Sequence, residues 1–350
     1  MRKITLTNKI VLSGKETIFS VMKKLTVGDF RFQIVVKNKK LFGTVNDGDI
    51  RRAILRGESL QEPIYKCVNK NPIIGIEEEP DKYPMLLKSV ASEIKYLPIV
   101  DEKKKLKYII IESKSSYERT ALIMAGGMGK RLGEKTKNMP KPLLRIGNKP
   151  ILEHLLLSLE KADFKKIFIS TYYLHEKIEK FIAKRKSRNK IELILEKEPL
   201  GTAGSINLLP KNSYDNLTVL NGDLITDINL EALNSFHKEQ DNDITITVAK
   251  YQYDIPFGSV KFDKSYNLLS LREKPTREEF VLSGIYCLSK DTCKLVRKRK
   301  LDMTTLIFKA SKLNKRIGVF PIYEYWKDVG TPKDFDVVNK LFSSSSKKIK

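Results

Sequence analysis

One glycine-rich segment has a composition that suits an anion. Residues 121–125 (ALIMA) have the apolar pattern of a buried strand, and glycines follow at 126, 127 and 129. Glycine lets backbone N–H groups approach an anion closely, and Arg131 and Lys141 add positive charge. The segment is not a P-loop, because Arg131 stands where Ser or Thr would follow the lysine, and its later glycines are spaced too widely for a dinucleotide fingerprint. It predicts a phosphate-binding turn at the carboxyl end of a strand.

Two aspartates suit a hard cation beside such a turn. Asp223 ends the strand-like segment 217–220 through Asn-Gly-Asp, and Asp328 lies in the late turn WKDVG. Carboxylate oxygens are the ligands for Mg²⁺ that is shared with phosphates. Nucleotidyl transfer needs charge neutralisation and in-line positioning more than acid–base groups, so a site of arginine, lysine and carboxylates without histidine fits it.

The elements that must position these residues follow an α/β rhythm. Downstream of Thr120, apolar strands alternate with helices predicted at 151–164, 174–186 and 201–209. This alternation predicts a mainly parallel sheet with helices on both faces. After Asn242 the strands crowd together, which predicts a mixed sheet on the substrate side. A last helix near 333–342 closes the domain, and residues 343–350 are expected to be a disordered tail.

The N-terminal third has a different organisation. Two half-similar units each contain an apolar strand, a charged turn and a second apolar strand, which predicts an internal repeat of roughly 60 residues. Asp49 is expected to cap a short helix in the first unit. A polar linker at 112–119 separates these units from the α/β part. The predicted division is therefore 1–118, 119–342 and the tail 343–350.

Charge and composition narrow the class of protein. The 350 residues carry 66 basic and 42 acidic side chains, a net charge of +24. The lysines are spread along the chain without interleaved aromatic residues, so we expect a phosphate-rich small substrate and no specific nucleic acid. Three scattered cysteines and three histidines argue against a disulfide framework and a transition-metal site. Without a membrane span or signal peptide, we expect a cytoplasmic protein with no membrane partner.

Seven motifs in order resemble the sugar-1-phosphate nucleotidylyltransferases. They are AGGMGKRL followed by PKPLL, EPLGTAGSI (198–206), LNGDLITDI (220–228), FGSVKFD (257–263), LREKP (271–275), VLSGIY (281–286) and WKDVGTP (326–332). The resemblance implies a Rossmann-like nucleotide-diphospho-sugar transferase domain with a mixed sheet. It also implies attack by a sugar-1-phosphate oxygen on the α-phosphorus of a nucleoside triphosphate, giving nucleotide-sugar and pyrophosphate.

The same resemblance assigns roles to individual positions. Nucleotide binding is implied for Ala125, Gly126, Gly127, Gly129, Arg131, Lys141, Glu196, Gly201 and Asp223. Sugar-phosphate binding is implied for Gly258, Glu273, Lys274, Ser283 and Gly284, with Glu273 accepting from hydroxyls and Lys274 meeting the phosphate. The implied catalytic residues are Arg131, Lys141, Asp223 and Asp328, and the two aspartates would hold Mg²⁺.

Substrate choice depends on a few departures from the family pattern. Glu196 and Glu198 lie where members of the family contact the nucleotide base. A carboxylate can accept from both donors of the guanine Watson–Crick edge, which favours GTP. Ser283 and Ser259 replace residue types that are common in relatives. Both positions are on the sugar side, so the identity of the sugar stays open.

The N-terminal third resembles a tandem pair of cystathionine-β-synthase-type (CBS) domains, carried by GTVNDGDIRR at 43–52. In nucleotide-binding members the aspartate equivalent to Asp49 holds ribose hydroxyls. Asn46 occupies the place of a phosphate-contacting Ser or Thr, and the second unit has no matching aspartate. One purine nucleotide effector site or structural dimerisation are equally compatible with this pattern, and we expect residues 1–118 to be dispensable for chemistry.

These observations predict a Mg²⁺-dependent, homo-oligomeric enzyme that transfers the nucleotidyl group of GTP to glucosamine-1-phosphate. The combination with the CBS pair resembles the glucosamine-1-phosphate guanylyltransferases of nonulosonic (legionaminic) acid biosynthesis for surface glycans. Three alternatives stay open. They are mannose-1-phosphate guanylyl transfer, a thymidylyl- or cytidylyl-transferring relative, and a non-catalytic regulatory subunit.

Overall fold

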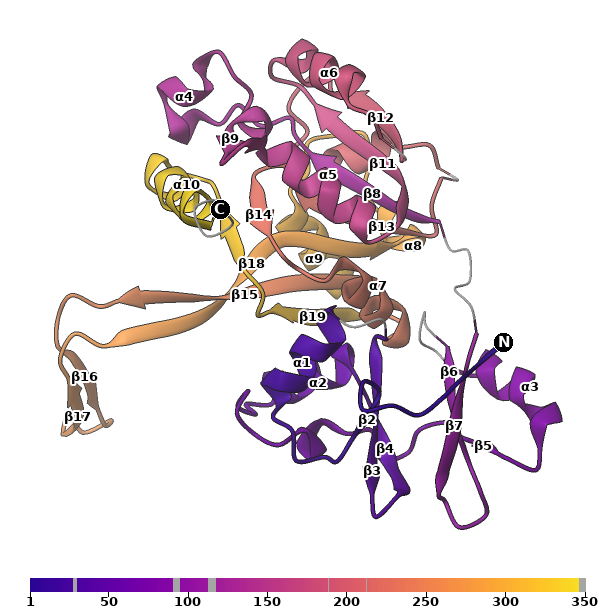
Figure 1. Ribbon diagram of the computed structural model, residues 1–350. Helices are drawn as coiled ribbons and strands as arrows, with labels where there is room; N and C mark the ends of the chain where they lie inside the picture. The colour runs from indigo at the N-terminus through magenta and orange to yellow at the C-terminus, as the bar shows by residue number, and fades with distance from the viewer. Residues whose placement is uncertain (28–29, 91–94, 113–117, 188, 212, 346–350) are drawn as a thin grey trace.

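The computed structural model describes residues 1–350 except 28–29, 91–94, 113–117, 188, 212 and 346–350. Figure 1 shows two parts, an N-terminal part in indigo and purple and a larger α/β part above it. The α/β part begins with strand β8 (Arg119–Met124). Most of the predicted linker, 113–117, lies outside the described residues.

The N-terminal part contains the same order of elements twice, as the predicted repeat requires. Each unit has a short strand, a helix and an antiparallel strand pair, and the short strand runs parallel to the first member of that pair. The first unit comprises β2 (Val11–Leu12), α1 (Ile18–Val27), β3 (Phe32–Lys37), β4 (Lys40–Asn46) and α2 (Asp47–Leu55). The second comprises β5 (Gly75–Ile76), α3 (Tyr83–Lys88), β6 (Tyr96–Val100) and β7 (Leu106–Ile111), with β1 (Arg2–Ile4) paired to β7.

Helix α2 begins one turn earlier than the sequence predicts. Asn46 is the N-cap, because its side chain accepts from the backbone N–H of Asp49 at 2.9 Å. Asp49 accepts in return from the backbone N–H of Asn46, also at 2.9 Å. Asp49 is thus the third helical residue of a capping box, and the prediction that it caps the helix itself was wrong.

A seven-stranded mixed sheet organises the α/β part. Its order is β12-β11-β8-β13-β18-β15-β19, and β18 alone runs antiparallel to its neighbours. The strands are β11 (Phe164–Thr171), β12 (Lys190–Leu195), β13 (Asn216–Asn221), β15 (Ile244–Asp254), β18 (Thr276–Ser289) and β19 (Ile317–Ile322), together with β8. Of the strands after Asn242, β15, β18 and β19 therefore extend the same sheet.

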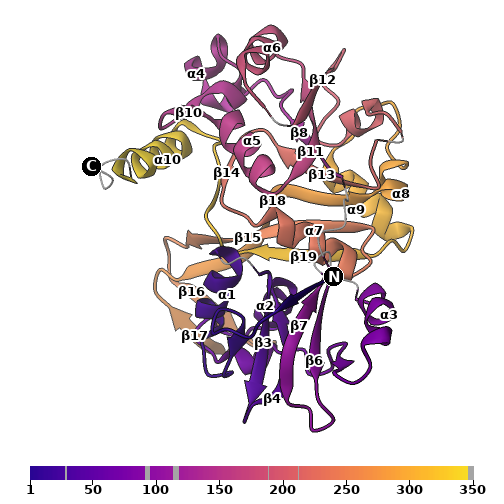
Figure 2. The ribbon, with the colours of Figure 1, turned by 45° about the vertical axis from the view of Figure 1, so that its right-hand side comes forward.

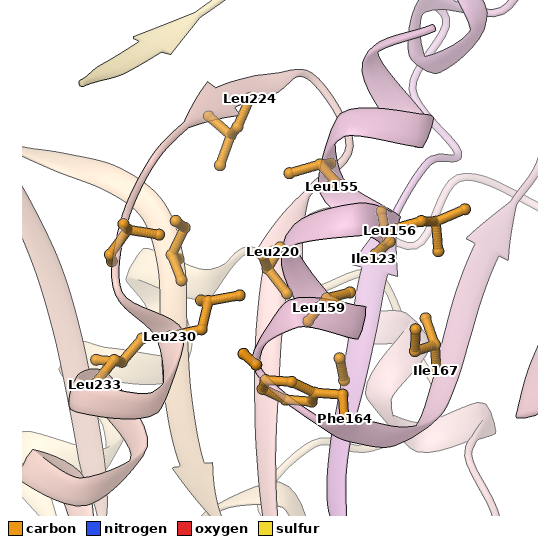
Figure 3. Close-up of a cluster of buried hydrophobic side chains, with 14 of the residues drawn as sticks. Ile123, Leu155, Leu156, Leu159, Phe164, Ile167, Leu220, Leu224, Leu230 and Leu233 are labelled. Carbon is orange, nitrogen blue, oxygen red and sulfur yellow. The ribbon is translucent and has the colours of Figure 1, made fainter. Parts of the chain in front are cut away.

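Helices cover both faces of this sheet, as predicted. One face packs against α5 (Ile151–Lys161), α6 (His175–Lys184) and α7 (Leu230–Glu239). The other packs against α8 (Lys290–Cys293), α9 (Met303–Lys312) and the 3-10 turn η5 (Gly204–Leu208). Figure 3 shows leucines of α5 directed at strand residues such as Ile123 and Leu220. Each fully buried leucine contributes about 1.5–3 kcal/mol through loss of water contact, and this core fixes the strand ends that carry the site.

Two predicted segments differ from the structure. The helix predicted over 201–209 is only the 3-10 turn η5, because Gly201 has a positive φ of 76° and the backbone N–H groups of Ala203 and Gly204 donate to Leu301. The last helix, α10, runs from Pro332 to Ser345, so it includes the first three residues of the predicted tail. The rest of that tail lies outside the described residues.

Short elements surround the carboxyl edge of the sheet. They are η3 (Lys130–Leu132), α4 (Glu134–Lys137), η4 (Lys141–Leu143), the pair β9 (Arg145–Ile146) and β10 (Lys149–Pro150), and the antiparallel pair β14 (Leu224–Thr226) and β20 (Trp326–Asp328). Strands β15 and β18 continue beyond the sheet as a long arm that ends in β16 (Ser259–Phe262) and β17 (Leu268–Arg272).

The two parts meet where α2 packs on the sheet-edge strand β19 and on helix α7. Figure 2 shows the first unit directly beneath these two elements. Among the described residues, no helix is long and apolar enough to span a bilayer.

Candidate active site

The glycine-rich turn follows β8 at the carboxyl edge of the sheet. Gly129 has a φ of 64°, and a Cβ there would lie 2.9 Å from the Thr136 side chain. The Thr136 hydroxyl donates to the Gly129 carbonyl at 2.9 Å, and this hydrogen bond stabilises the turn. A Cβ on Gly127 would meet nothing within 4 Å, so this backbone borders open space. The turn therefore has the shape and the free surface that an anion-binding loop needs.

Lys141 joins this turn to the two predicted metal ligands. Its side chain is 9% exposed, and its Nζ lies 2.5 Å from Oδ2 of Asp223 and 3.6 Å from Oδ1 of Asp328. Asp223 follows β13, and β14 pairs with β20 so that Leu224 stands opposite Asp328. The Val329 backbone N–H also donates to the Asp223 carbonyl at 3.0 Å. Segments that lie about a hundred residues apart in the chain are thereby fixed side by side.

The carboxylate pair has spare acceptor capacity. Oδ1 of Asp223 and Oδ1 of Asp328 are both buried and have no hydrogen-bond partner among the described residues. Burial and the neighbouring Asp223 charge raise the pKa of Asp328, while Lys141 and Arg131 oppose that rise. Two like charges held together beside one lysine leave net negative charge, which a divalent cation would neutralise.

The donor set fits Mg²⁺ that is shared with a substrate. Within the described part of the chain, no cluster of three or more His, Cys, Asp or Glu side chains could form an all-protein metal cage. Mg²⁺ is usually bound by one or two carboxylates together with substrate phosphates and water. Asp223 and Asp328 supply that number of carboxylates next to a phosphate-binding turn.

Arg131 lies on the same side as the carboxylates. It is exposed on η3 and lies near Asp328, since a Cβ on Gly330 would lie 3.7 Å from Arg131 Nη1 and 3.4 Å from Asp328 Oδ1. The exposed guanidinium is free to meet a phosphate. Arg131, Lys141, Asp223 and Asp328, which the sequence predicts as one catalytic group, thus lie together.

Glu196 is buried beside the same turn, whereas Glu198 is exposed. Glu196 accepts from the Ser170 hydroxyl and from the Leu200 backbone N–H at 2.9 Å, and approaches Gly126 so closely that a Cβ there would lie 3.0 Å from its Oε1. Ser170, which the sequence analysis missed, orients the Glu196 carboxylate. Its position at the carboxyl end of β11, next to β8, is the signal that could have found it.

Gly201 has a packing explanation. A Cβ there would lie 2.6 Å from Asp302 Oδ1 and 2.7 Å from the Leu301 carbonyl. The loop after Glu196 is therefore pressed against the segment before α9, and the Thr202 hydroxyl accepts from the Met303 backbone N–H at 2.8 Å. The glycine lets this loop lie close to its support.

Two predicted sugar-side residues lie inside the sheet near Asn221. Gly284 has a φ of 80°, and a Cβ there would lie 2.6 Å from Asn221 Nδ2. Ser283 is buried, and its hydroxyl bonds to that of Thr247. Its carbonyl accepts from Trp326 Nε1 at 2.8 Å, which ties β18 to β20. The Ser283 side chain thus serves packing between strands.

The other predicted sugar-side residues belong to the arm. Gly258 and Glu273 lie together, since a Cβ on Gly258 would lie 3.2 Å from Glu273 Oε2, and Lys274 has a φ of 42°. All three are exposed. Figure 1 shows the arm projecting away from the sheet. The structure brings the nucleotide-side residues together and keeps Gly258, Glu273 and Lys274 on this separate projection, so their predicted role stays a prediction.

This fold and site define a nucleotidyl transferase. Residues 120–344 match the family model described as nucleotidyl transferase, and the chain belongs to that family. The mannose-1-phosphate guanylyltransferase catalytic subunit beta of Xenopus tropicalis is 34% identical over 226 residues, which cover 61% of this chain and 62% of the relative. The mannose-1-phosphate guanyltransferase of Schizosaccharomyces pombe is 32% identical over 241 residues, 66% of each chain.

Solved structures agree with this fold. HddC from Yersinia pseudotuberculosis matches with a TM-score of 0.52 and 28% identity over 64% of this chain and 99% of that one. Its complex with GMP-PN matches with a TM-score of 0.50 and 27% identity, over the same shares of the two chains. The chain spans about 62% of the length of the first curated relatives that it matches, and the family match begins at Thr120, after the N-terminal part.

Proposed function

We propose that this protein transfers the guanylyl group of GTP to a sugar-1-phosphate, releasing pyrophosphate. The observation that carries the proposal is Lys141 held between Asp223 and Asp328 beside the glycine-rich turn, with one buried oxygen on each carboxylate that accepts no hydrogen bond from the described residues. That arrangement offers positive charge, backbone donors and two metal-ligand oxygens in one place. Relatives named as mannose-1-phosphate guanylyltransferases support the reaction class.

In this proposal the chain's residues bind and orient, and no side chain forms a covalent bond. A phosphate oxygen of the sugar-1-phosphate forms a bond to the α-phosphorus of GTP, the bond to the β-phosphate oxygen breaks, and its electron pair leaves with pyrophosphate. Backbone N–H groups of residues 126–129 hold the triphosphate, and Arg131 and Lys141 neutralise the negative charge that develops on it. Lys141 also contacts both aspartates and so holds them close together.

Asp223 and Asp328 would hold Mg²⁺. Bound there, the ion would supply a Lewis acid for the phosphate oxygens. Burial and the neighbouring Asp223 charge both raise the pKa of Asp328, and a bound cation would favour its ionised form. Both aspartates are therefore needed to hold the cation that would neutralise the triphosphate.

Glu196 is the residue that we assign to guanine. Its position next to Gly126 places a carboxylate beside the nucleotide turn, and Ser170 and Leu200 fix its orientation. A carboxylate accepts both donors of the guanine edge, whereas thymine and uracil present one donor between two acceptors. The exposed Glu198 becomes the matched control.

The sugar is proposed as glucosamine-1-phosphate, with mannose-1-phosphate as the alternative that the names of the relatives favour. Glu273 would accept from sugar hydroxyls and Lys274 would contact the sugar phosphate after the arm approaches the sheet. Because both residues are exposed on the arm here, substrate binding must bring them toward Asp223 and Asp328 for this role to hold.

One experiment tests the function. The purified protein is incubated with GTP, ATP, CTP, UTP and dTTP against glucosamine-1-phosphate, mannose-1-phosphate and glucose-1-phosphate, and pyrophosphate is measured. We expect the highest kcat/KM with GTP and one of the first two sugars. A preference for dTTP or CTP would reject the guanine assignment, and no pyrophosphate in any combination would favour a regulatory subunit.

We further propose that the N-terminal part has a regulatory, CBS-like role with a purine nucleotide as effector. Asn46, Asp49, Arg52, Asn69 and Tyr96 line one pocket together with Glu239 of the transferase part. A ligand there would touch both parts, and it could alter activity by binding one conformation better than another. AMP, ADP or ATP binding measured by calorimetry tests this role, and loss of binding in Asp49→Asn is the expected result.

A further inference from the structure

Arg51 of α2 is completely buried at the contact between the two parts of the chain. Its Nε lies 2.5 Å from Oδ2 of Asp47, and its Nη2 lies 2.7 Å from Oε1 of Glu324. Its Nη1 donates to the Pro321 carbonyl. The guanidinium also lies 4.0 Å from the centre of the Phe320 ring. Three of these four partners belong to the transferase part.

A buried guanidinium needs such a set of partners. Removing a cation from water costs several kcal/mol, which is offset only where charged and hydrogen-bonding groups surround it. Here two carboxylates and a carbonyl accept hydrogen bonds from the guanidinium of Arg51. Burial alone would raise the pKa of Glu324, but the charge of Arg51 and the hydrogen bonds that the carboxylate accepts together outweigh this effect and lower the pKa of that carboxyl. The cluster is therefore rigid and specific in its geometry, as paired arginine forks are.

The segment that Arg51 holds leads directly to Asp328. After Pro321 and Glu324, the Tyr325 carbonyl accepts from the Thr226 hydroxyl at 3.0 Å and from the Asp227 backbone N–H at 2.9 Å. Trp326 then donates to Ser283, and β20 ends at Asp328. Pro321, Glu324, Tyr325 and Trp326 are thus each held by a contact, and Arg51 holds the end of the segment that lies farthest from the site.

We propose that Arg51 is a positioning residue, supplied by the N-terminal part, that sets β20 so that the Asp328 carboxylate meets Asp223 and Lys141. The inference rests on the proposed role of Asp328 as a metal ligand. It predicts that metal affinity depends on a residue of the N-terminal part that touches neither metal nor substrate. Groups that support metal ligands in this way alter metal affinity by about 10- to 100-fold when they are replaced.

The test measures Mn²⁺ binding to the full chain by electron paramagnetic resonance, and the rate of pyrophosphate release as Mg²⁺ is varied. Arg51→Met should weaken Mn²⁺ binding by about 10-fold or more, raise the Mg²⁺ concentration for half-maximal rate similarly, and change KM for the sugar-1-phosphate by less than about threefold. Arg51→Lys retains the charge without the planar fork and should recover part of the loss.

Arg31→Met is the matched control. Arg31 also joins the two parts, through Glu231 of α7 at 3.1 Å, and Glu231 lies far along the chain from the segment 321–328. Its replacement should leave Mn²⁺ binding within about twofold of the parent. An equal loss in both variants would overturn the proposal, because it would show a general effect of loosening the contact.

A second variant keeps the test decisive if Arg51→Met fails to fold. Arg51→Met combined with Glu324→Met leaves one buried carboxylate without its partner, that of Asp47, whereas Arg51→Met alone leaves two, and each unpaired buried charge is costly. The folded double variant should still bind Mn²⁺ more weakly than the parent. Parent-like binding in either folded variant overturns the inference alone, whereas a parent chain that binds no Mn²⁺ and releases no pyrophosphate overturns the proposed function with it.

Discussion

At the scale of single residues, the central feature is one lysine shared by two aspartates. Asp223→Asn or Asp328→Asn keeps the shape of the side chain and removes one negative metal-ligand oxygen. Turnover should fall by at least ~10²-fold in either variant, the magnitude expected for losing one oriented electrostatic group. Steady-state pyrophosphate release measures it, and Asp291→Asn, which only breaks an exposed ion pair with Lys294, is the control. Activity within threefold of the parent in both variants would contradict the assignment.

Base selection is the second prediction at this scale. In Glu196→Gln the new amide can donate to the Ser170 oxygen while its carbonyl accepts from Leu200, so the fold of the loop is retained. The guanine edge loses one charge-assisted bond worth about 1.5–3 kcal/mol. The ratio of kcat/KM for GTP over dTTP should therefore fall roughly ten- to hundredfold, whereas Glu198→Gln should leave it unchanged. The reverse result would move the base contact to Glu198.

The sequence predicts some residues of this site well and others poorly. The proximity of Gly129, Lys141, Asp223 and Asp328 follows from their residue types and their places near the ends of strands, while their roles stay predictions. Arg51 is not found in this way, because a charged residue in an amphipathic helix reads as exposed, and its burial depends on Glu324 far along the chain. Tertiary partners of this kind leave no local pattern.

At the scale of elements, the strands and long helices follow the apolar periodicity. Helix α5 ends at Lys161, three residues before the predicted end at Phe164, and Phe164 begins β11 instead. The segment 201–209 is apolar and small enough for a helix, but its backbone donates to Leu301 and leaves only a 3-10 turn. Where a loop is paired with a distant segment, local propensity is overridden.

Helix α7 carries a buried histidine that predicts acid sensitivity. Burial lowers the pKa of His237 from 6.5 to about 4, and its Nδ1 bonds to the Thr245 hydroxyl at 2.9 Å. Between pH 6.5 and 4 the unfolded chain binds a proton here that the folded chain does not, so stability falls as the pH falls. The loss amounts to about 3 kcal/mol by pH 4.

His237→Asn retains an acceptor for Thr245 and removes the titration. Denaturant unfolding at pH 7.5 and pH 4.5 should show a smaller loss of stability in this variant than in the parent. Comparison at pH 7.5, where His237 is neutral in both states, measures the packing cost of the substitution by itself. An identical acid loss in the two proteins would contradict the role of His237.

At the scale of the whole molecule, the arm exposes an unusual amount of apolar surface. Its exposed large side chains are Tyr251, Tyr253, Phe257, Val260, Phe262, Tyr266, Leu268, Leu269, Leu271, Phe280 and Leu282. A contiguous apolar patch on a protein surface commonly marks an interface. We therefore expect the predicted homo-oligomer to form through the arm, with a second copy of the chain covering it.

Light scattering after size exclusion should give a mass above that of one 40.2 kDa chain. Phe262→Ser with Leu269→Ser should shift the protein toward the monomer without lowering its melting temperature, because both side chains are already exposed. Phe308→Ser replaces a phenylalanine on α9 that is at least as exposed as Phe262, and it should not shift the protein toward the monomer. A monomeric parent at tens of micromolar would reject the arm as an interface.

The contact between the two parts changes the expectation for residues 1–118. From the sequence they are dispensable for chemistry, since the family motifs begin after Arg119. Their removal would also remove Arg51, which contacts Pro321 and Glu324, and Glu324 lies four residues before Asp328. From the proposed role of Arg51 we therefore expect the two folded parts to be coupled in function, and the isolated transferase part to bind metal less well than the full chain.

The most direct test of the whole account follows the label in GTP. With glucosamine-1-phosphate or mannose-1-phosphate and Mg²⁺, GTP labelled at the α-phosphorus should give labelled nucleotide-sugar, and GTP labelled at the γ-phosphorus should give labelled pyrophosphate. Both products should disappear in EDTA and in Asp223→Asn. Label recovered as free GMP or GDP, or transfer that proceeds undiminished in EDTA, would contradict metal-dependent guanylyl transfer at the site of Lys141, Asp223 and Asp328.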